Sequence, residues 1–469
     1  MAKASSGNLA GQSTAAVRTP GYAEIESLKL SALFNLHLSL FSGVFRPIAA
    51  LDQTHAEFAD ADQLRYALPG LPPMVMLKTA RAVKAVFTAP AYSFGTASEV
   101  GASLLGTETF FAIDGPKHHQ HRRLILPHFH GKHLHDYGAV IAAITREAMA
   151  EWTPGRPFPI HAGCQEITLR SMLRILLGYS AQDRFAQLES SFRAILNTPL
   201  LAACIFFKPL QVDAGPWSPW GKLLRLKHQV SQLLLAEIED RRQRDQSQGD
   251  VLGLLLAATD EQGQRLTAEE LRDELMALMF AANEATAAAL AWSLYWVHRD
   301  AGIRDRLLGE LAALGGSEDP MEIAKLPYLS AVCNETLRIS PVTLFAIPRA
   351  TRETFPLAGY DIEPGVLLAP CIYLVHRDPA VYSDPQVYRP ERFLDRQYSA
   401  YEFLPFGGTN RRCVGAALAL FEMKVVLATV LRDLEISLMG GERTQPQRHG
   451  MTFIPSGGLP VIARMRTSG

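Results

Sequence analysis

Apolar residues recur at intervals of three and four along most of the chain, which is the period of helices with one buried face. This pattern predicts helices over residues 20–43, 221–244 and 267–280. Strand patterns are fewer and fall in residues 64–79, 349–377 and 448–466, the last of which predicts a C-terminal hairpin. There is no internal repeat and no βαβ series, so the pattern predicts a mainly α protein with a minor β region.

One apolar segment is long enough to cross a bilayer. Residues 275–297 read LMALMFAANEATAAALAWSLYWV, with Asn283, Glu284 and Thr286 at the centre. A charged carboxylate there would cost roughly 2.5 kcal/mol or more in a membrane. We therefore expect a long helix buried in a soluble protein, without a transmembrane anchor. Its polar centre indicates either a functional site or an ordinary buried helix with one awkward turn.

Composition restricts the class of protein and of partner. The chain has 469 residues, of which 48% are hydrophobic, and a formal net charge of −1. That charge gives no electrostatic reason to expect nucleic acid as a partner. Residues 1–20 are small and polar, so we expect a loose tail before a single domain over residues 21–469. Five scattered cysteines, with no CxxC pair, fit a reducing cytosol and hence a cytoplasmic protein.

A lone cysteine stands between a glycine turn and a helix in FGGTNRRCVG, residues 406–415. A helix start favours the thiolate and is expected to lower the pKa of Cys413. Gly407 and Gly408 allow a tight turn and a close backbone approach. A nucleophile, a redox centre, a metal ligand and a buried structural cysteine all remain open. A haem iron would suit one thiolate, with Arg411 as a cation for a propionate.

This loop resembles the haem-binding loop of the cytochrome P450 family, with Phe406 seven residues before the cysteine. Other marks of that family follow its order along the chain. ETLR, Glu335 to Arg338, and Arg392 in RPERF match the Glu–Arg–Arg cluster, which is structural in the family. AANEAT, residues 281–286, is similar to the oxygen-activating motif. His118 and Arg122 in DGPKHHQHRR, and Arg349 in FAIPRATRETF, match the family's propionate ligands.

The resemblance implies a cytochrome P450 fold, which is a helical prism with a long central helix and a small β-sheet domain. It implies a monooxygenase that holds haem b through Cys413 and uses O2 on a lipophilic substrate. No flavin-binding extension is seen, so electrons are expected from a separate ferredoxin and ferredoxin reductase, with NAD(P)H as the distant source. Lys117, Arg123 and Arg412 are candidates for a basic docking face. A monomer is expected.

The sequence departs from the family pattern at two places. Thr409 replaces the glycine usually found four residues before the cysteine, and we expect Gly407 and Gly408 to keep the turn. Ala285 stands where the family has a threonine directly after the acid. The catalytic candidates are therefore Glu284, Ala285 and Thr286. We expect the proton donor to be a water ordered by Glu284 and Thr286, or a hydroxyl on the substrate. On a helix Thr286 is rotated by about 100° from Ala285, so replacing Thr286 is expected to do little harm and replacing Glu284 to slow turnover.

Positions that match the family's substrate-contact regions are apolar, and each of them could equally be plain core. They are Leu104, Leu105, Met279, Phe280, Ala281, Val342, Leu344, Phe345 and Phe453. Together they predict a terpene, polyketide or fatty acyl substrate. The alternative is coupling, ring formation or desaturation in natural-product biosynthesis, because a missing threonine often accompanies unusual chemistry. A haem-based gas sensor or carrier would need a fused output domain, for which the chain leaves no room.

Overall fold

The computed structural model describes residues 22–24, 47–66, 72–96, 105–178, 182–198, 210–244, 249–440 and 444–466. The predicted tail 1–20 and the candidate Leu104 lie outside these residues. So does most of the helix predicted over residues 20–43. Within that helix Tyr22–Glu24 form strand β1, which pairs in parallel with β2, so the prediction is wrong there. Sheet pairing overrides the local apolar period at these three residues.

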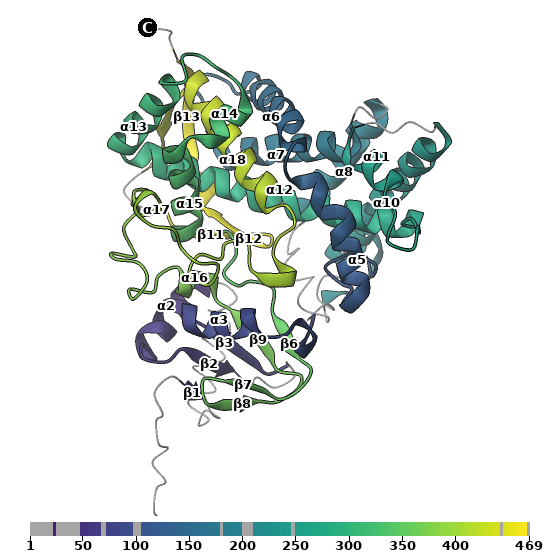
Figure 1. The fold of residues 1–469 in the computed structure, drawn as a ribbon. Helices are drawn as coiled ribbons and strands as arrows, with labels where there is room; N and C mark the ends of the chain where they lie inside the picture. Colours follow the sequence, from purple (N-terminus) through teal and green to yellow (C-terminus); the bar gives the residue numbers. More distant parts are fainter. Residues whose placement is uncertain are drawn as a thin grey trace, which may run out of the picture.

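Helices make up most of the described chain (Figure 1). They are α2 (Pro47–Glu57), α3 (Ala80–Thr88), α5 (Gly115–Ile125), α6 (His133–Ala150), α7 (Ile160–Leu177), α8 (Gln182–Leu196), α10 (Pro219–Arg244), α11 (Val251–Ala257), α12 (Ala268–Arg299), α13 (Ala301–Ala312), α14 (Pro320–Lys325), α15 (Pro327–Ile339), α16 (Ile372–Val375), α17 (Arg392–Asp395) and α18 (Ala416–Asp433). The helices predicted over residues 221–244 and 267–280 correspond to α10 and the start of α12.

Strands form a minor part, as predicted. The largest sheet has the order β1-β2-β3-β9-β6-β4 and lies with α2 and α3 at one end of the molecule (Figure 1). The described strands are β1 (Tyr22–Glu24), β2 (Gln63–Tyr66), β3 (Met74–Leu77), β4 (Phe94–Thr96), β5 (Pro157–Pro159), β6 (Arg349–Thr351), β7 (Phe355–Leu357), β8 (Tyr360–Ile362), β9 (Leu367–Pro370), β10 (Leu434–Leu438), β11 (Pro446–His449), β12 (Thr452–Pro455) and β13 (Pro460–Met465).

The C-terminal strands differ from the predicted single hairpin. β11 and β12 do form a hairpin, with their own register from Pro446–Pro455 to His449–Thr452. β13 leaves that hairpin and pairs with β10 on one edge and β5 on the other. The hairpin therefore forms its own two-stranded sheet, and β12 packs against α12. There Trp292 Nε1 of α12 donates to the Phe453 carbonyl of β12.

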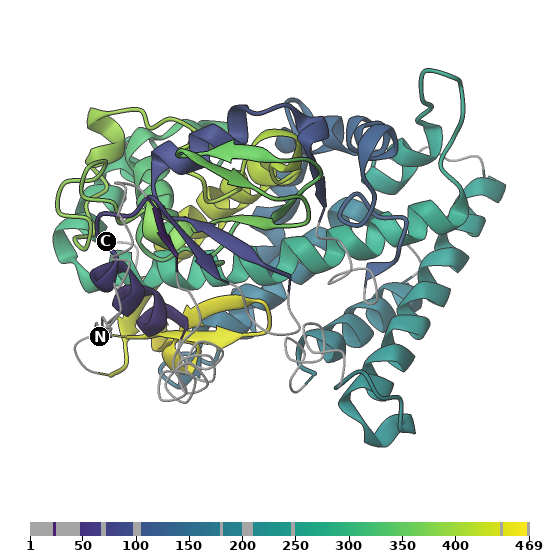
Figure 2. The ribbon, with the colours of Figure 1, turned by 90° about the horizontal axis from the view of Figure 1, so that it is seen from below.

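Helix α12 crosses the helical part of the molecule from end to end (Figure 2). It begins with a capping box, in which Thr267 and Glu270 satisfy each other's backbone N–H groups. Its length and hydropathy would allow it to span a membrane, the one such helix in the described residues, but most of its most apolar window is buried inside the protein. The predicted buried helix is therefore present, and α7 packs along it.

Two kinds of hydrophobic core meet beside α12. A large core joins α12 to α6, α7, α15 and α18, and smaller cores join the six-stranded sheet to α3 and the segment around Leu344. The arrangement is mainly α with a minor β region, as predicted. A cavity lies between these cores, and its walls come from both.

Candidate active site

The cavity takes its walls from segments far apart in the chain. They include α5, α12, α15, α16, α18, parts of residues 342–347 and the cysteine loop of residues 405–415, together with Phe110, Phe111, Phe129 and Met172. The space that no protein atom fills, including the part open to solvent, is about 1400 Å³. Most of the lining is apolar. Its arginines, His118 and Cys413 lie on α5 and the cysteine loop, and Thr286, Thr343 and Glu422 are polar residues elsewhere on the wall. The cavity is thus a large apolar chamber with one polar end.

The cysteine loop presents Cys413 at the cavity surface. The Cys413 N–H donates to the Phe406 carbonyl at 2.9 Å, which closes the loop. Gly407 has φ +64, as a tight turn requires. Gly408 is extended at φ −156, and it is glycine for another reason, because a Cβ there would lie 2.1 Å from the Phe87 ring.

Thr409 itself carries the left-handed conformation, with φ +54. Gly407 thus carries part of the turn, as expected, but Gly408 is extended and Thr409 takes a left-handed conformation itself. A β-branched residue in this region is strained by roughly 1–2 kcal/mol. The Thr409 hydroxyl gains two contacts in return, because it accepts from Arg349 and lies 3.2 Å from Asn410 Oδ1.

The thiol of Cys413 is accessible from the cavity and enclosed by protein on its other sides. This burial raises the pKa of Cys413, and the Gly415 N–H and the charges of Arg122 and Arg412 offset only part of the rise. The expectation that the helix start would lower this pKa is therefore wrong for the protein alone. A bound metal ion removes the proton from a coordinating thiol outright, so the site fits a metal ligand better than a free nucleophile.

Helix α5 supplies polar groups to the same end of the cavity. Asp114 caps its N-terminus by accepting from the Gly115 N–H at 2.9 Å. His118 and Arg122, one turn apart, both line the cavity. Both ring nitrogens of buried His118 lack a partner. Burial and the charge of Arg411 lower the pKa of His118 to about 4, so it is a neutral donor at pH 7. Unpartnered donors beside a thiol fit haem with its propionates.

The two other predicted propionate arginines differ from this pair. Arg411 lines the cavity but already donates to the Phe110 and Ile113 carbonyls and to Asp114, at 2.8, 2.7 and 3.0 Å. Arg349 does not line the cavity. It donates to the Gly408 carbonyl and to Thr409, with its guanidinium 5.0 Å above the Phe87 ring. In this structure Arg349 holds the cysteine loop.

The polar side chains at the centre of α12 contact different parts of the protein. Asn283 donates to Gln165 O and Thr168 Oγ1, both at 2.9 Å, on α7. Ala285 and Thr286 line the cavity. Glu284 is not among the lining residues.

The Glu284 carboxylate meets the β11–β12 hairpin instead. It accepts from the Met451 N–H at 3.2 Å and lies 3.3 Å from His449 Nδ1. Gly450, at φ +52, makes this approach possible, since a Cβ there would fall 1.9 Å from Glu284 Oε1. Glu284 therefore faces the hairpin and Thr286 faces the cavity, although the larger effect was expected from Glu284.

Three of the predicted substrate-contact residues line the cavity, namely Ala281, Val342 and Phe345. Leu105, Met279, Leu344 and Phe453 are buried in the hydrophobic cores instead, and Phe280 packs against the core. Further lining residues that the sequence did not predict are Phe110, Phe111, Phe129, Met172, Leu278 and Glu422. The adjacent Phe110 and Phe111 just before the Asp114 helix cap were the signal that could have found the first two.

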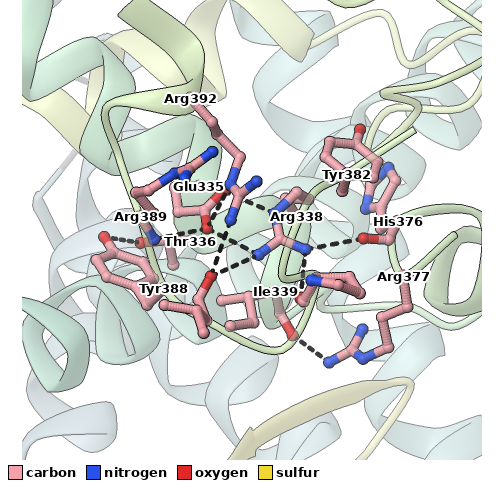
Figure 3. A network of polar contacts seen from close by, with 12 residues as sticks. Glu335, Thr336, Arg338, Ile339, His376, Arg377, Tyr382, Tyr388, Arg389 and Arg392 are labelled. Atoms are coloured by element: carbon pink, nitrogen blue, oxygen red, sulfur yellow. Dashed lines mark hydrogen bonds and ion pairs between the residues drawn. The ribbon is translucent and has the colours of Figure 1, made fainter. Parts of the chain in front are cut away.

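The Glu–Arg–Arg cluster is fully buried (Figure 3), and Leu337 on its helix α15 lines the cavity. Glu335 binds Arg338 through two bonds of 2.7 Å and Arg392 at 3.1 Å. Arg338 also donates to the His376 and Pro385 carbonyls, each at 2.8 Å. The cluster thus joins α15 to the segment that leads into the cysteine loop. Its structural role remains a prediction.

Two of the three candidate docking cations have acidic neighbours. Lys117 pairs with Glu108 and with Glu270, and Arg123 pairs with Glu261. Arg412 is exposed and lines the mouth of the cavity. The face is therefore less basic than the sequence alone suggests.

Known proteins resemble this chain in sequence and in fold. The model of the cytochrome P450 family matches residues 62–460. Cytochromes P450 135B1 and 138 of Mycobacterium tuberculosis are 34% and 32% identical, over 87% and 84% of this chain and 87% of each relative. A retinoic-acid-bound cyanobacterial CYP120A1 superposes with a TM-score of 0.79 at 23% identity, covering 91% of this chain and 96% of its own. The P450DA haem domain gives 0.78 at 20% identity, covering 90% and 93%.

Proposed function

The chain belongs to the cytochrome P450 family, and on this premise we propose that it inserts one oxygen atom from O2 into a lipophilic small molecule, with Cys413 as the axial ligand of its haem. Membership makes it a P450 monooxygenase with a haem-thiolate iron. The observation that carries the finer proposal is the shared cavity. Cys413, Arg122, the unpartnered ring of His118 and an apolar wall from α12 all face the same space.

The residues divide the work between the two ends of the cavity. His118 and Arg122 would hold the haem propionates, and Cys413 would hold the iron. The bound haem supplies oxygen activation, which a thiolate ligand favours. Ala281, Ala282, Ala285 and Ala289 form the wall on α12. Their small side chains leave room for a substrate, and the aromatic rings opposite exclude water from it.

Replacing Cys413 with Ser tests the ligand assignment. Because serine provides no thiolate, the ferrous–CO Soret band typical of thiolate ligation should vanish while haem can still bind. Arg412→Ser is a useful control, since it changes the neighbouring residue and leaves the sulfur in place. A thiolate-type band that survives in Cys413→Ser would disprove the assignment.

A lipophilic substrate is supported by the aromatic and aliphatic lining, which includes Phe110, Phe111, Phe129, Met172, Leu278 and Phe345. No lysine lines the cavity among the described residues, and its arginines lie at the polar end with Cys413. We infer a terpene, polyketide or fatty acyl substrate. A screen of such ligands for a Soret shift tests this class, and selective binding of small hydrophilic ligands would contradict it.

Non-hydroxylating chemistry is the second candidate, because Ala285 places a methyl group on the cavity wall where the family has a hydroxyl. Coupling, ring formation or desaturation would consume O2 without placing its oxygen in the product. Mass spectrometry of products formed under 18O2 separates the two reactions. A labelled product supports insertion, and an unlabelled oxidised product supports the alternative.

Electrons are proposed to come from a ferredoxin and its reductase, with a nicotinamide cofactor as their source, in a cytoplasmic setting. The exposed Arg412 beside Cys413 supports docking of an acidic donor near the thiolate. An electrostatic encounter slows as salt screens it. The rate of first reduction by a ferredoxin should therefore fall between low and high ionic strength, and more weakly in Arg412→Gln. A rate independent of salt would count against this partner.

A further inference from the structure

The segment that carries Phe110 and Phe111 is held from two sides. The Phe110 N–H donates to Glu274 Oε1 of α12 at 2.9 Å. The Phe110 carbonyl accepts from Arg411 Nη1 of the cysteine loop at 2.8 Å. The two phenyl rings lie 4.2 Å apart, and both face the cavity. The backbone of Phe110 is thus tied to the central helix and to the loop that carries Cys413.

Glu274 is well placed to act as an anchor. Its side chain is fully buried, and the same Oε1 also lies 2.7 Å from His121 Nδ1, while Oε2 has no partner. His121 belongs to α5, so Glu274 joins α12, α5 and the Phe110 segment through a single oxygen. Burying a carboxylate is costly unless it is bonded. Loss of the Glu274 carboxylate would leave both the Phe110 N–H and His121 Nδ1 without this partner.

Among the described residues, Glu274 is the only acid that accepts a hydrogen bond from the Phe110 N–H. Its neighbour Asp273 turns to Arg272, at 2.6 Å. Glu270, one turn earlier, pairs with Lys117 of α5 and lies 3.8 Å from His121 Nε2. Lys117 also pairs with Glu108.

The chain before Phe110 lies tight against α12. A Cβ at Gly106 would lie 2.2 Å from the Asp273 carboxylate, and Gly106 has φ +107. The segment is therefore pressed against the helix at Gly106 and bonded to it at Phe110. It has little freedom to adjust if the bond to Glu274 is lost.

We propose that Glu274, steadied by His121, is the positioning residue that fixes the Phe110–Phe111 wall and so limits the size of ligand admitted above Cys413. This proposal rests on the proposed function, since it assigns a selectivity role within the same cavity. Glu274 does not touch the ligand. It acts through the backbone of Phe110, because its Oε1 accepts the hydrogen bond that holds the Phe110 N–H in place.

The experiment measures how tightly imidazole and the bulkier 4-phenylimidazole bind to the holoenzyme, from their Soret shifts. Glu274→Leu removes the acceptor at similar volume, and we expect the ratio of the two affinities to shift by about tenfold, a typical effect of reshaping a pocket. Glu274→Gln keeps an acceptor oxygen and should stay within about threefold of the native ratio. Asp273→Asn, which leaves the Phe110 bond intact, is the matched control.

Three outcomes decide the matter. An unchanged ratio in Glu274→Leu, with only a lower thermal midpoint, would show a merely structural role and overturn the proposal. A shift in Asp273→Asn as large as that in Glu274→Leu would also overturn it, because general damage to α12 would then be the cause. Absence of a thiolate-type CO band in the native protein would instead refute the proposed function, so the two failures are distinct.

Hydrogen exchange covers the case in which Glu274→Leu does not fold. In the native holoenzyme the Phe110 amide should exchange slowly, because its N–H is bonded to a buried carboxylate. His121→Gln should speed that exchange while leaving peptides from α18 unchanged. A Phe110 amide that exchanges as fast as exposed loop amides in the native protein would overturn the proposal.

Discussion

Thr286 is the residue of α12 that combines a hydroxyl with a place on the cavity wall. Glu284, two residues earlier, turns to His449 and Met451 on the hairpin. A group that delivers protons must come within hydrogen-bond reach of the reacting oxygen, directly or through one water. The described geometry gives that position to Thr286.

Thr286→Ala should therefore raise the peroxide released per nicotinamide consumed. We expect turnover to slow by about tenfold, less than the roughly hundredfold contributed by a dedicated acid, because ordered water can replace part of a hydroxyl's role. Glu284→Gln keeps an acceptor for the Met451 N–H and should change peroxide release little. If Glu284→Gln raises peroxide and Thr286→Ala does not, protons pass through Glu284 and His449 instead.

Glu422 of α18 is a buried carboxyl on the cavity lining with one oxygen unpartnered. Burial raises its pKa to about 8. The folded state therefore holds this proton more tightly than the unfolded chain does. Its stabilising effect is complete below the ordinary pKa of a glutamate and is lost as the pH rises through about 8.

Glu422→Gln should remove this pH dependence, since an amide does not titrate. Between about pH 5 and pH 8 the native protein should lose up to about 1.4 kcal/mol of unfolding free energy per pH unit relative to the variant. Denaturant unfolding of both proteins at pH 6, 7 and 8 measures the difference. Parallel curves for the two proteins would mean that Glu422 finds a partner and stays ionised.

At the scale of elements, the buried cluster of Glu335, Arg338 and Arg392 ties α15 to α17. Arg392 also donates to the Ser383 and Val387 carbonyls, at 2.9 and 3.1 Å. Removing one member leaves a buried charge and several carbonyls unpaired. Such losses typically cost roughly 3–5 kcal/mol.

Arg392→Ala should accordingly give mostly haem-free or aggregated protein. Arg389→Ala is the matched control, because its backbone N–H, which donates to Glu335 at 2.8 Å, remains after truncation. The yield of holoprotein, read from the haem-to-protein absorbance ratio, measures the effect. Normal holoenzyme with only slower turnover in Arg392→Ala would contradict a structural role.

Sequence predicted the elements best where local chemistry decides them. The start of α12 follows from the Thr267–Glu270 capping box, and the start of α5 from Asp114. β1 escaped prediction because the chain there reads as helix and only its pairing with a distant strand makes it extended. The break between β12 and β13 likewise depends on partners elsewhere in the chain.

The site was predicted in part for the same reason. Cys413, His118 and Arg122 meet at the cavity as their motifs imply. Met279 and Phe453 are apolar and buried, but burial alone does not say whether a side chain faces a cavity or a neighbouring helix. The contact of Glu284 with the hairpin could not be predicted in this way. The helical period indicates on which side of α12 the carboxylate lies, but it does not reveal that the turn at Gly450 packs against it.

Across the whole molecule, the cavity separates the helical core from the core of the six-stranded sheet. A haem bound there would touch α5, α12 and the cysteine loop at once. A ligand that binds only the folded state adds stability, about 4 kcal/mol at a thousandfold excess over its dissociation constant. Bound haem should therefore stabilise the segments that line the cavity more than it stabilises the helices packed away from it.

Removing haem should therefore lower the thermal midpoint by several degrees and loosen the protein unevenly. Hydrogen exchange should rise in peptides covering residues 105–125 and 405–415, which line the cavity. Peptides from the α7–α12 contact, which is held by Asn283 and Thr168, should change little. Uniform exposure of all helices would show that the protein has no independent core without haem.

The contact between Gly450 and Glu284 also bears on how this chain could evolve. Any side chain at position 450 would collide with the carboxylate, whose oxygen lies 1.9 Å from the Cβ site. In a Glu284→Ala background that collision disappears and only the cost of the left-handed backbone remains. The two positions should thus show strong epistasis, with a double change milder than the sum of the single changes. A substitution of Gly450 in the hairpin would therefore be tolerated only after Glu284 in the central helix has been replaced by a smaller residue.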